Sequence, residues 1–286
     1  MSAINKSLYE KMTITSVNGA KTADIKSGVI SFNYYEDVYS PMITARLVVV
    51  NTGNSIEGED GKMQSLYNGL PLRGGERIEI NWNNLTMYGN LRKPKNIDNP
   101  PVVIMCMGLD SAKEEMETNE RVFLDRGIAT LAFDGPGQGE SEYLAPICPE
   151  YEEPVSAVID FIEKRDDLSS ERVAIWGVSL GGYYAPRAAS YDDRLKACIS
   201  LTGPFAWSNI FDRIPGLTKE AFIHRSKCYS EDEAREFASR MDLSGCAKNI
   251  KCPLYIAGGG LDRVVPHEES KLLAEAVNGD VVYNYI

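Results

Sequence analysis

The stretch RVAIWGVSLGGYYAPRAA, residues 172–189, decides the fold of this 286-residue chain. An apolar run leads into GVSLG at 177–181, which fits the pattern G-x-S-x-G, and a helix-forming segment follows. On a tight strand-to-helix turn, side chains two residues from the serine would collide with neighbouring backbone, which explains the glycines. The pattern predicts Ser179 as a nucleophile on such a turn. The plainer alternative is a glycine-rich turn that only packs a helix close to a sheet.

Strands and helices alternate on both sides of this turn. Continuous apolar runs, typical of strands buried on both faces, occupy 100–109, 128–134, 172–178, 195–204 and 251–262. Helical segments occupy 113–127, 154–165, 183–191 and 268–277. A last apolar run follows at 281–286, and LTMYGNLRKP at 85–94 predicts a short strand pair ahead of the first run. Repeated strand–helix units predict an α/β fold with a doubly wound, mostly parallel sheet.

A serine hydroxyl becomes an effective nucleophile only when an adjacent base removes its proton. In folds of this kind the members of the triad follow in the chain order serine, acid, histidine. Asp262 follows an apolar run and a glycine turn in CPLYIAGGGLDRVVP, residues 252–266. We therefore predict Asp262 as the acid that orients the base. The alternative is an ordinary turn aspartate ahead of a helix that Pro266 opens.

The oxyanion formed in such a reaction needs two backbone donors. MCMGLDS, residues 105–111, follows the first predicted buried strand, where one of these amides belongs. We predict the Leu109 N–H as the first donor and the Leu180 N–H, directly behind the nucleophile, as the second. Because both roles belong to the backbone, the side chains provide no independent check.

The glycines of DGPGQGES, residues 134–141, have the spacing G-x-G-x-G and not the G-x-G-x-x-G of a dinucleotide-binding turn. No cofactor is therefore expected, and the turn is expected to shape the rim of the site. The six cysteines are scattered, with no CxxC pair, so neither a metal site nor a disulfide framework is expected. Free thiols of this kind indicate a reducing compartment, and we predict a cytoplasmic location.

Charge and hydropathy exclude several classes of partner. The net charge of −11 disfavours binding to nucleic acid and to anionic membrane surfaces. No apolar run approaches the roughly 18 residues of a membrane span, and MSAINKSLYEKM lacks the apolar region of a signal peptide. The expected partner is a small-molecule substrate, and a homo-oligomer stays open.

Four segments of the second part of the chain resemble an α/β-hydrolase subgroup that contains FrsA-like esterases and 2,6-dihydroxypseudooxynicotine hydrolase. They are GLDSAKEE (108–115), RGIATLAFDGPGQGE (126–140), WGVSLGGYYAPRAA (176–189) and CPLYIAGGGLDRVVP (252–266). The resemblance spans nearly all of 85–286. It implies the α/β-hydrolase fold and a serine hydrolase that cleaves an ester, or a carbon–carbon bond next to a carbonyl, through an acyl-enzyme at Ser179.

The resemblance has a limit in the segment after the fourth strand. In the carbon–carbon hydrolase a glutamate after the fourth strand assists, whereas LTGPFAWSNIFDRIPG at 201–216 has no glutamate, so that activity is not carried over. Asp212, the acid in this segment, has the pattern of a surface residue. Residues 204–248 form an insertion that the resemblance implies to be a helical lid, lined by Phe205, Trp207 and Phe211. Packing of these aromatic rings in a core is the alternative.

Residues 1–84 have a different pattern, rich in β-branched and aromatic residues. The expected strands lie in MTITSVNG (12–19, with a turn at Asn18-Gly19), SGVISFNYYEDVYS (27–40), MITARLVVVNTG (42–53) and ERIEINW (76–82). Four segments resemble the N-terminal part of baseplate or tail structural proteins of T4-like marine phages: SLYEKMTITSVNG (7–19), TADIKSGVISFNYYEDVYSP (22–41), ITARLVVVNTGNSI (43–56) and YNGLPLRGGERI (67–78). The resemblance implies an assembly module with a phage tail as its partner. Two domains, 1–84 and 85–286, are expected.

The chain has two histidines, and neither fits the order of a triad. His224 lies in the insertion, before the acid, and His267 follows Asp262 by only five residues. The base is expected in a loop after 281–286, where the sequence stops. We therefore expect the chain to be incomplete at its C-terminus and impaired in turnover as given. The alternatives are a phage structural component with an inert hydrolase part, and a ligand-binding protein that has lost catalysis.

Overall fold

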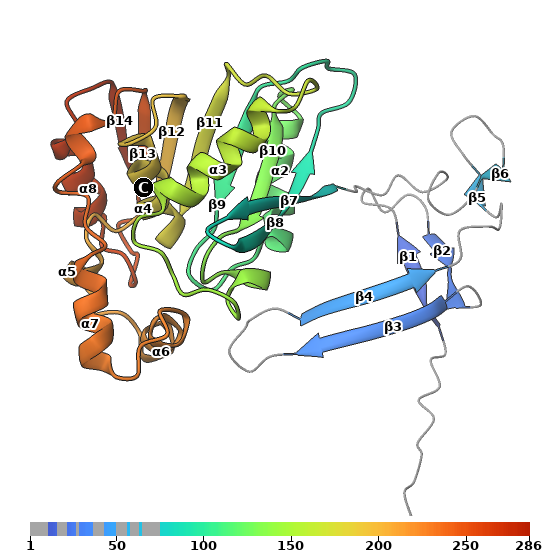
Figure 1. The fold of residues 1–286 in the computed structure, drawn as a ribbon, viewed down its shortest axis with the longest axis horizontal. Helices are drawn as coiled ribbons and strands as arrows, with labels where there is room; N and C mark the ends of the chain where they lie inside the picture. Colours follow the sequence, from blue (N-terminus) through green and yellow to red (C-terminus); the bar gives the residue numbers. More distant parts are fainter. Residues whose placement is uncertain are drawn as a thin grey trace, which may run out of the picture. The chain divides into compact units, whose positions relative to one another are not determined.

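The computed structural model describes residues 11–15, 22–26, 29–36, 43–49, 56–57, 63–64 and 75–286. The chain divides into two compact units, Met1–Gly74 and Gly75–Ile286 (Figure 1). This boundary precedes the expected one at 84/85, because β7 (Glu76–Trp82) pairs with β8 (Leu85–Arg92) in the sheet of the second unit. ERIEINW is thus the edge strand of that sheet, and 85–92 is one strand and not a strand pair.

Eight strands of the second unit form one sheet in the order β14-β13-β12-β11-β9-β10-β8-β7. The six not yet introduced are β9 (Val102–Cys106), β10 (Ala129–Asp134), β11 (Val173–Val178), β12 (Leu195–Leu201), β13 (Leu254–Gly258) and β14 (Val281–Tyr285). β8 runs antiparallel to β7 and β10, and every other neighbouring pair is parallel. The predicted α/β class with a mostly parallel sheet is confirmed.

The helices connect these strands along the chain (Figure 1). They are η2 (Lys113–Met116), α2 (Glu117–Leu124), η3 (Gly139–Ser141), α3 (Glu152–Glu163), α4 (Leu180–Ala189), α5 (Trp207–Ile210), α6 (Gly216–Arg225), α7 (Glu231–Ser239), η4 (Ala247–Asn249) and α8 (His267–Ala276). Every residue of β9 and β10 is buried, as expected for central strands covered on both faces. α4 packs on β11 and β12 and begins at Leu180, directly behind Ser179.

The hairpin of β7 and β8 at the edge of the sheet alternates between buried and more exposed side chains. In β7, Ile78 and Ile80 are each 3% exposed, while Glu79 between them faces solvent. β8 alternates buried and half-buried positions along its whole length. The apolar face predicted for ERIEINW is therefore real, but it covers the core of the second unit.

The first unit contains short antiparallel pairs. β1 (Thr13–Thr15) pairs with β2 (Thr22–Asp24), β3 (Val29–Glu36) with β4 (Ile43–Val49), and β5 (Ile56–Glu57) with β6 (Met63–Gln64). The turn expected at Asn18-Gly19 and most of the connection at 51–75 lie outside the described residues. The resemblance of this unit to phage tail proteins stays a prediction. In the part of the chain that the structure describes, no helix has the length and apolar character to span a bilayer.

Candidate active site

Ser179 stands on the turn between β11 and α4. Its backbone has φ 55° and ψ −121°, a conformation that costs a non-glycine residue energy and that clusters at active sites. The Ser179 N–H donates to the Leu201 carbonyl at 2.9 Å, and the Gly182 N–H donates to the Ser179 carbonyl at 2.8 Å. The side chain is half-buried. The turn predicted from G-x-S-x-G is thus present, with the serine at its apex.

The glycines of this turn are required by backbone contacts. A Cβ on Gly177 would lie 1.9 Å from the Gly181 carbonyl oxygen, and a Cβ on Gly181 would lie 2.0 Å from the Cys106 carbonyl oxygen. Neither contact can be relieved by rotating a side chain, because the opposing atoms belong to the backbone. The turn therefore seats α4 directly against the end of β9.

The loop after β9 passes beside the nucleophile. A Cβ built on Gly108 would lie 3.4 Å from Ser179 Cβ and 3.7 Å from Ser179 Oγ. The next residue is Leu109, whose amide is the first predicted oxyanion donor. Leu180 is the first residue of α4, so its N–H has no acceptor within the helix. The structure thus brings the segment of both predicted donors to Ser179.

Gln138 supports this loop from behind and was not identified from the sequence. Its side chain is fully buried, and its Nε2 donates to the Met107 carbonyl at 3.0 Å and to the Gly108 carbonyl at 2.8 Å. The Tyr151 hydroxyl donates to Gln138 Oε1 at 2.9 Å. No signal in the sequence indicates this role, because a polar residue in a turn between a strand and a helix is ordinarily exposed to solvent.

An ion pair fastens the same loop further along. Lys113 is 1% exposed, and its Nζ lies 2.7 Å from Asp134 Oδ2 and 2.6 Å from Glu140 Oε1. The Lys113 N–H also donates to Asp134 Oδ1 at 2.9 Å. Burial alone would lower the pKa of Lys113, but the charge and hydrogen bond of Asp134 raise it above the ordinary lysine value. Lys113 is therefore charged and ties the segment after Leu109 to the end of β10.

Asp262 follows β13 in a short turn. Its Oδ1 accepts hydrogen bonds from the Val264 N–H at 2.8 Å and the Val265 N–H at 3.0 Å. Such bonds are typical of an aspartate in a turn. The alternative interpretation of Asp262 as a turn residue therefore accounts for Oδ1. Oδ2 has no donor among residues 75–286. β12 alone separates β13 from β11, so the ends that carry Asp262 and Ser179 are about 10 Å apart by strand spacing.

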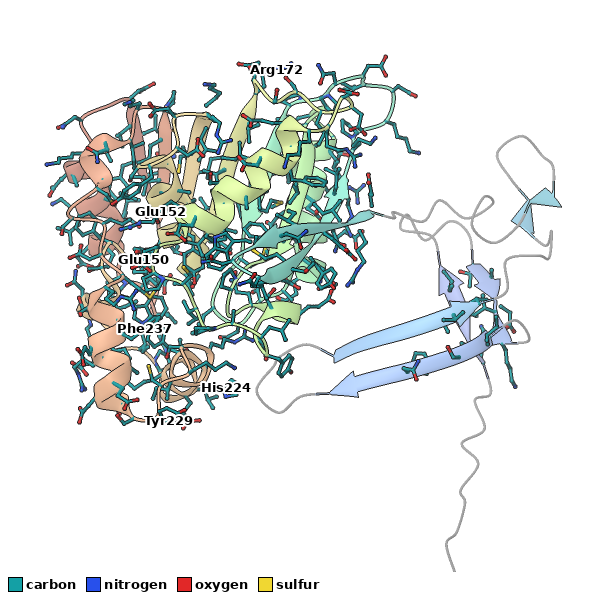
Figure 2. All side chains as sticks on the ribbon, in the orientation of Figure 1. Glu150, Glu152, Arg172, His224, Tyr229 and Phe237 are labelled. Carbon is teal, nitrogen blue, oxygen red and sulfur yellow. The ribbon has the colours of Figure 1, made fainter. Side chains whose placement is uncertain are left out.

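The end of β14 reaches the turn of Asp262. The Ile286 N–H donates to the Gly258 carbonyl at 2.9 Å, and the Gly260 N–H donates to the Ile286 carbonyl at 2.7 Å. His267 opens α8 with its ring edge-on to Tyr285, 4.8 Å between centroids, and its Nδ1 lies 3.4 Å from Glu268. His224 lies on α6 in the insertion, where Figure 2 labels it. Neither histidine occupies the loop after β14, and the identity of the base stays a prediction.

The insertion at 204–248 carries α5, α6 and α7. Trp207 is 1% exposed and stacks on Phe222 with centroids 4.9 Å apart. Phe211 and Phe237, the latter labelled in Figure 2, meet the same Phe222 ring edge-on at 5.8 and 6.0 Å. These rings form the core of the insertion. The alternative of core packing therefore describes Trp207 and Phe211, and Phe205 is likewise buried.

Two contacts fasten the insertion to the rest of the unit. Arg225, 2% exposed, pairs with Glu142 at 2.8 Å and donates from Nη1 to the Gly137 carbonyl at 3.0 Å. At the other end, Glu269 of α8 accepts from the Phe205 N–H at 3.0 Å and the Ala206 N–H at 3.1 Å. The start of α5 and the end of α6 are thus held by buried charged groups.

Asp110 lies between the candidate oxyanion loop and this insertion. Burial raises the pKa of its carboxyl, and the positive charge of Arg225 offsets part of that rise. Its Oδ1 is buried and has no hydrogen-bond partner among the described residues. Within the same residues, no group of three or more His, Cys, Asp or Glu side chains is placed to hold a metal ion.

Residues 101–222 match the family model described as alpha/beta hydrolase fold. The strand order, the single antiparallel strand β8 inside the sheet and the serine turn agree with that match. Residues 75–286 therefore have the α/β-hydrolase fold.

This domain is related to 2,6-dihydropseudooxynicotine hydrolase of Paenarthrobacter nicotinovorans, with 36% identity over 211 residues, 73% of this chain and 57% of that protein. The chain thus spans little more than half of that relative. A crystal structure of 2,6-dihydroxy-pseudo-oxynicotine hydrolase superposes with a TM-score of 0.70 at 36% identity, covering 74% of this chain and 61% of that one. The 20-hydroxy-prefusarin hydrolase of Gibberella moniliformis is 45% identical over 111 residues, 36% of this chain and 26% of that protein.

Proposed function

We propose that this protein is a serine hydrolase in which Ser179 attacks a carbonyl carbon and forms an acyl-enzyme. The observation that carries the proposal is the strained backbone of Ser179, φ 55° and ψ −121°, on a turn between a buried strand and a helix. That conformation has an energetic cost and exposes the hydroxyl at the C-terminal end of the sheet. Backbone atoms lie where a Cβ of residue 177 or 181 would stand, so this turn requires glycine at both positions.

The reaction follows from the groups around Ser179. A base takes the Oγ proton as the oxygen attacks, and the N–H groups of Leu109 and Leu180 stabilise the oxyanion. The base then protonates the leaving group, and water hydrolyses the acyl-enzyme by the same steps. Asp262 orients the base through Oδ2, while its Oδ1 is fixed by the backbone.

The base itself is proposed to be a histidine in a loop after β14. Ile286 exchanges two backbone hydrogen bonds with Gly258 and Gly260, four to two residues ahead of Asp262. These bonds hold the end of β14 beside the turn that leads to Asp262.

The proposed substrate is an ester or a ketone whose carbon–carbon bond next to the carbonyl is cleaved. Both reactions begin with attack of the serine on a carbonyl carbon and need the same two oxyanion donors. The similarity to 2,6-dihydropseudooxynicotine hydrolase supports including the second substrate class. The absence of a glutamate in residues 201–216, where one assists in that carbon–carbon hydrolase, favours the ester.

A fluorophosphonate probe tests the proposal, because it reacts with an activated serine and needs no knowledge of the substrate. In a chain that extends through the loop after β14 and so carries the proposed base, we expect labelling of the wild-type sequence, none of Ser179→Ala, and labelling at wild-type rate of Ser190→Ala. Ser190 is the matched control, since its buried hydroxyl ends α4 and donates to the Pro186 carbonyl at 2.7 Å. Equal labelling of the wild type and Ser179→Ala, or no labelling of either, would contradict the proposal.

A further inference from the structure

The buried amide of Gln138 contacts the peptide group that carries the candidate oxyanion donor. Its Nε2 lies 2.8 Å from the Gly108 carbonyl oxygen and 3.0 Å from that of Met107. The Gly108 carbonyl and the Leu109 N–H belong to one planar peptide unit and point in opposite directions. A donor that holds the carbonyl on one side therefore fixes the direction of the N–H on the other.

The amide of Gln138 is itself fixed by Tyr151. Two carbonyl oxygens face Nε2, and the Tyr151 hydroxyl donates to Oε1 at 2.9 Å, so the amide can make all three bonds in only one orientation. The phenol reaches it because residue 135 is glycine. A Cβ there would lie 2.0 Å from the hydroxyl oxygen.

Tyr151 is in turn held by the helix of the nucleophile. Its ring stacks on Tyr184 of α4 with centroids 3.5 Å apart and planes 7° apart, and both rings are fully buried. The contacts thus run from α4 through Tyr184, Tyr151 and Gln138 to the peptide of Leu109. Both sides of the site, the nucleophile helix and the oxyanion loop, are tied by one row of side chains.

We propose that Gln138 is a positioning residue that holds the Gly108–Leu109 peptide with its N–H directed at the oxyanion, and that Tyr151 locks the amide in the orientation required. The proposal rests on the proposed function for the meaning of the Leu109 N–H. Gln138 touches no substrate. Without its two hydrogen bonds the peptide is free to rotate, and the oxyanion loses one donor in part of the molecules.

The test measures kcat and KM for p-nitrophenyl acetate in Gln138→Leu, Tyr151→Phe and Ser141→Ala. We expect Gln138→Leu to lower kcat by roughly 10- to 100-fold with KM little changed, less than the 10²–10³-fold lost when a donor is removed outright. Tyr151→Phe keeps the ring stack and should lower kcat several-fold. Ser141→Ala is the matched control, because its buried hydroxyl donates at 2.9 Å to the Asp134 carbonyl in the same turn.

A purely structural role predicts another result. If kcat in Gln138→Leu and Tyr151→Phe stays at the Ser141→Ala value while only the melting temperature falls, the proposal is overturned. If Gln138→Leu does not fold, Tyr151→Phe decides. If Ser179→Ala is as active as the wild type, the proposed function fails. In that case the 1H–15N signal of the Leu109 amide tests the positioning role of Gln138. A shift of this signal in Gln138→Leu that is absent in Ser141→Ala supports that role. An unchanged signal overturns it.

Discussion

At the nucleophile turn, Gly181 lies so close to neighbouring backbone that only a hydrogen fits on its α-carbon. Gly181 lies where α4 passes the end of β9, and a Cβ there would meet the carbonyl oxygens of Cys106 and Met107 at 2.0 and 2.8 Å. The strain of Ser179 persists because such contacts determine the path of the chain on both sides of it.

Gly181→Ala is expected to lower the free energy of unfolding by about 3 kcal/mol or more, since backbone must move to admit the methyl group. Serine labelling should be lost with it. Gly245→Ala is the control, because a Cβ at Gly245 meets nothing within 4 Å. Thermal unfolding of the two variants measures the difference, and equal melting temperatures would contradict the steric account.

Asp110 gives a prediction on pH. Because burial raises the pKa of its carboxyl in the folded protein, the unfolded protein loses that proton first, and stability falls as the pH rises through the folded-state pKa. Asp110→Asn should therefore melt at a higher temperature than the wild type at neutral pH, by about 1–3 °C. The difference should vanish towards pH about 4. Melting temperatures measured across that range check it, and a difference independent of pH would refute it.

At the scale of single residues, the sequence predicted the residues that belong to a local motif. Ser179 and its glycines form a local pattern, and their steric relation is repeated wherever a strand turns tightly into a helix. Gln138 escaped prediction because its partners Met107 and Gly108 lie some thirty residues earlier, and Tyr151 follows it across a turn. Hydrogen bonds between buried groups so far apart in sequence leave no periodic trace.

Among the elements, the insertion is fastened to the rest of its unit by a buried charged pair. Arg225 at the end of α6 is 2% exposed and pairs with Glu142, whose side chain is 4% exposed. Arg225 also donates to the Gly137 carbonyl, in the turn that carries Gln138. The pair thus links the helices of the insertion to the rim of the candidate site.

Removing one member of this pair leaves an uncompensated buried charge. Arg225→Met and Glu142→Leu should each lower the free energy of unfolding by about 3–5 kcal/mol. The double variant should lose less than the sum of the two, because no lone charge stays buried. Urea unfolding of the four proteins completes the cycle. Additive losses would show that the two side chains stabilise the fold independently.

The strands show why elements are easier to predict than their partners. The alternation in ERIEINW correctly predicted a strand with one apolar face, yet the pattern carries no information on which sheet it covers. β7 pairs with β8, and β8 pairs with β10, which ends at Asp134. The register of these strands is set by contacts across the sheet, which the pattern of a single strand does not contain. The packing partners of the aromatic residues expected to line the lid could not be predicted for the same reason. Trp207 and Phe211 pack on Phe222, which belongs to another helix.

For the whole molecule, the second unit contains every strand of the eight-stranded sheet, together with Ser179, Asp262, Leu109 and Leu180 of the proposed site. A chain that begins at Gly75 should therefore fold with the melting temperature of that unit in the full chain, and Ser179 should react with the probe at the same rate. Calorimetry and labelling of the two chains test this. An unfolded or unreactive product would show that Met1–Gly74 contributes to the fold of the second unit.

The three tryptophans of the chain, Trp82, Trp176 and Trp207, lie at the edge hairpin, in the strand before the nucleophile and in the core of the insertion. Light absorbed at the red edge of the protein band therefore excites the second unit alone. Part of the resulting emission comes from Trp207, whose stack on Phe222 makes it sensitive to the packing of the insertion in a chain of full length without an added dye.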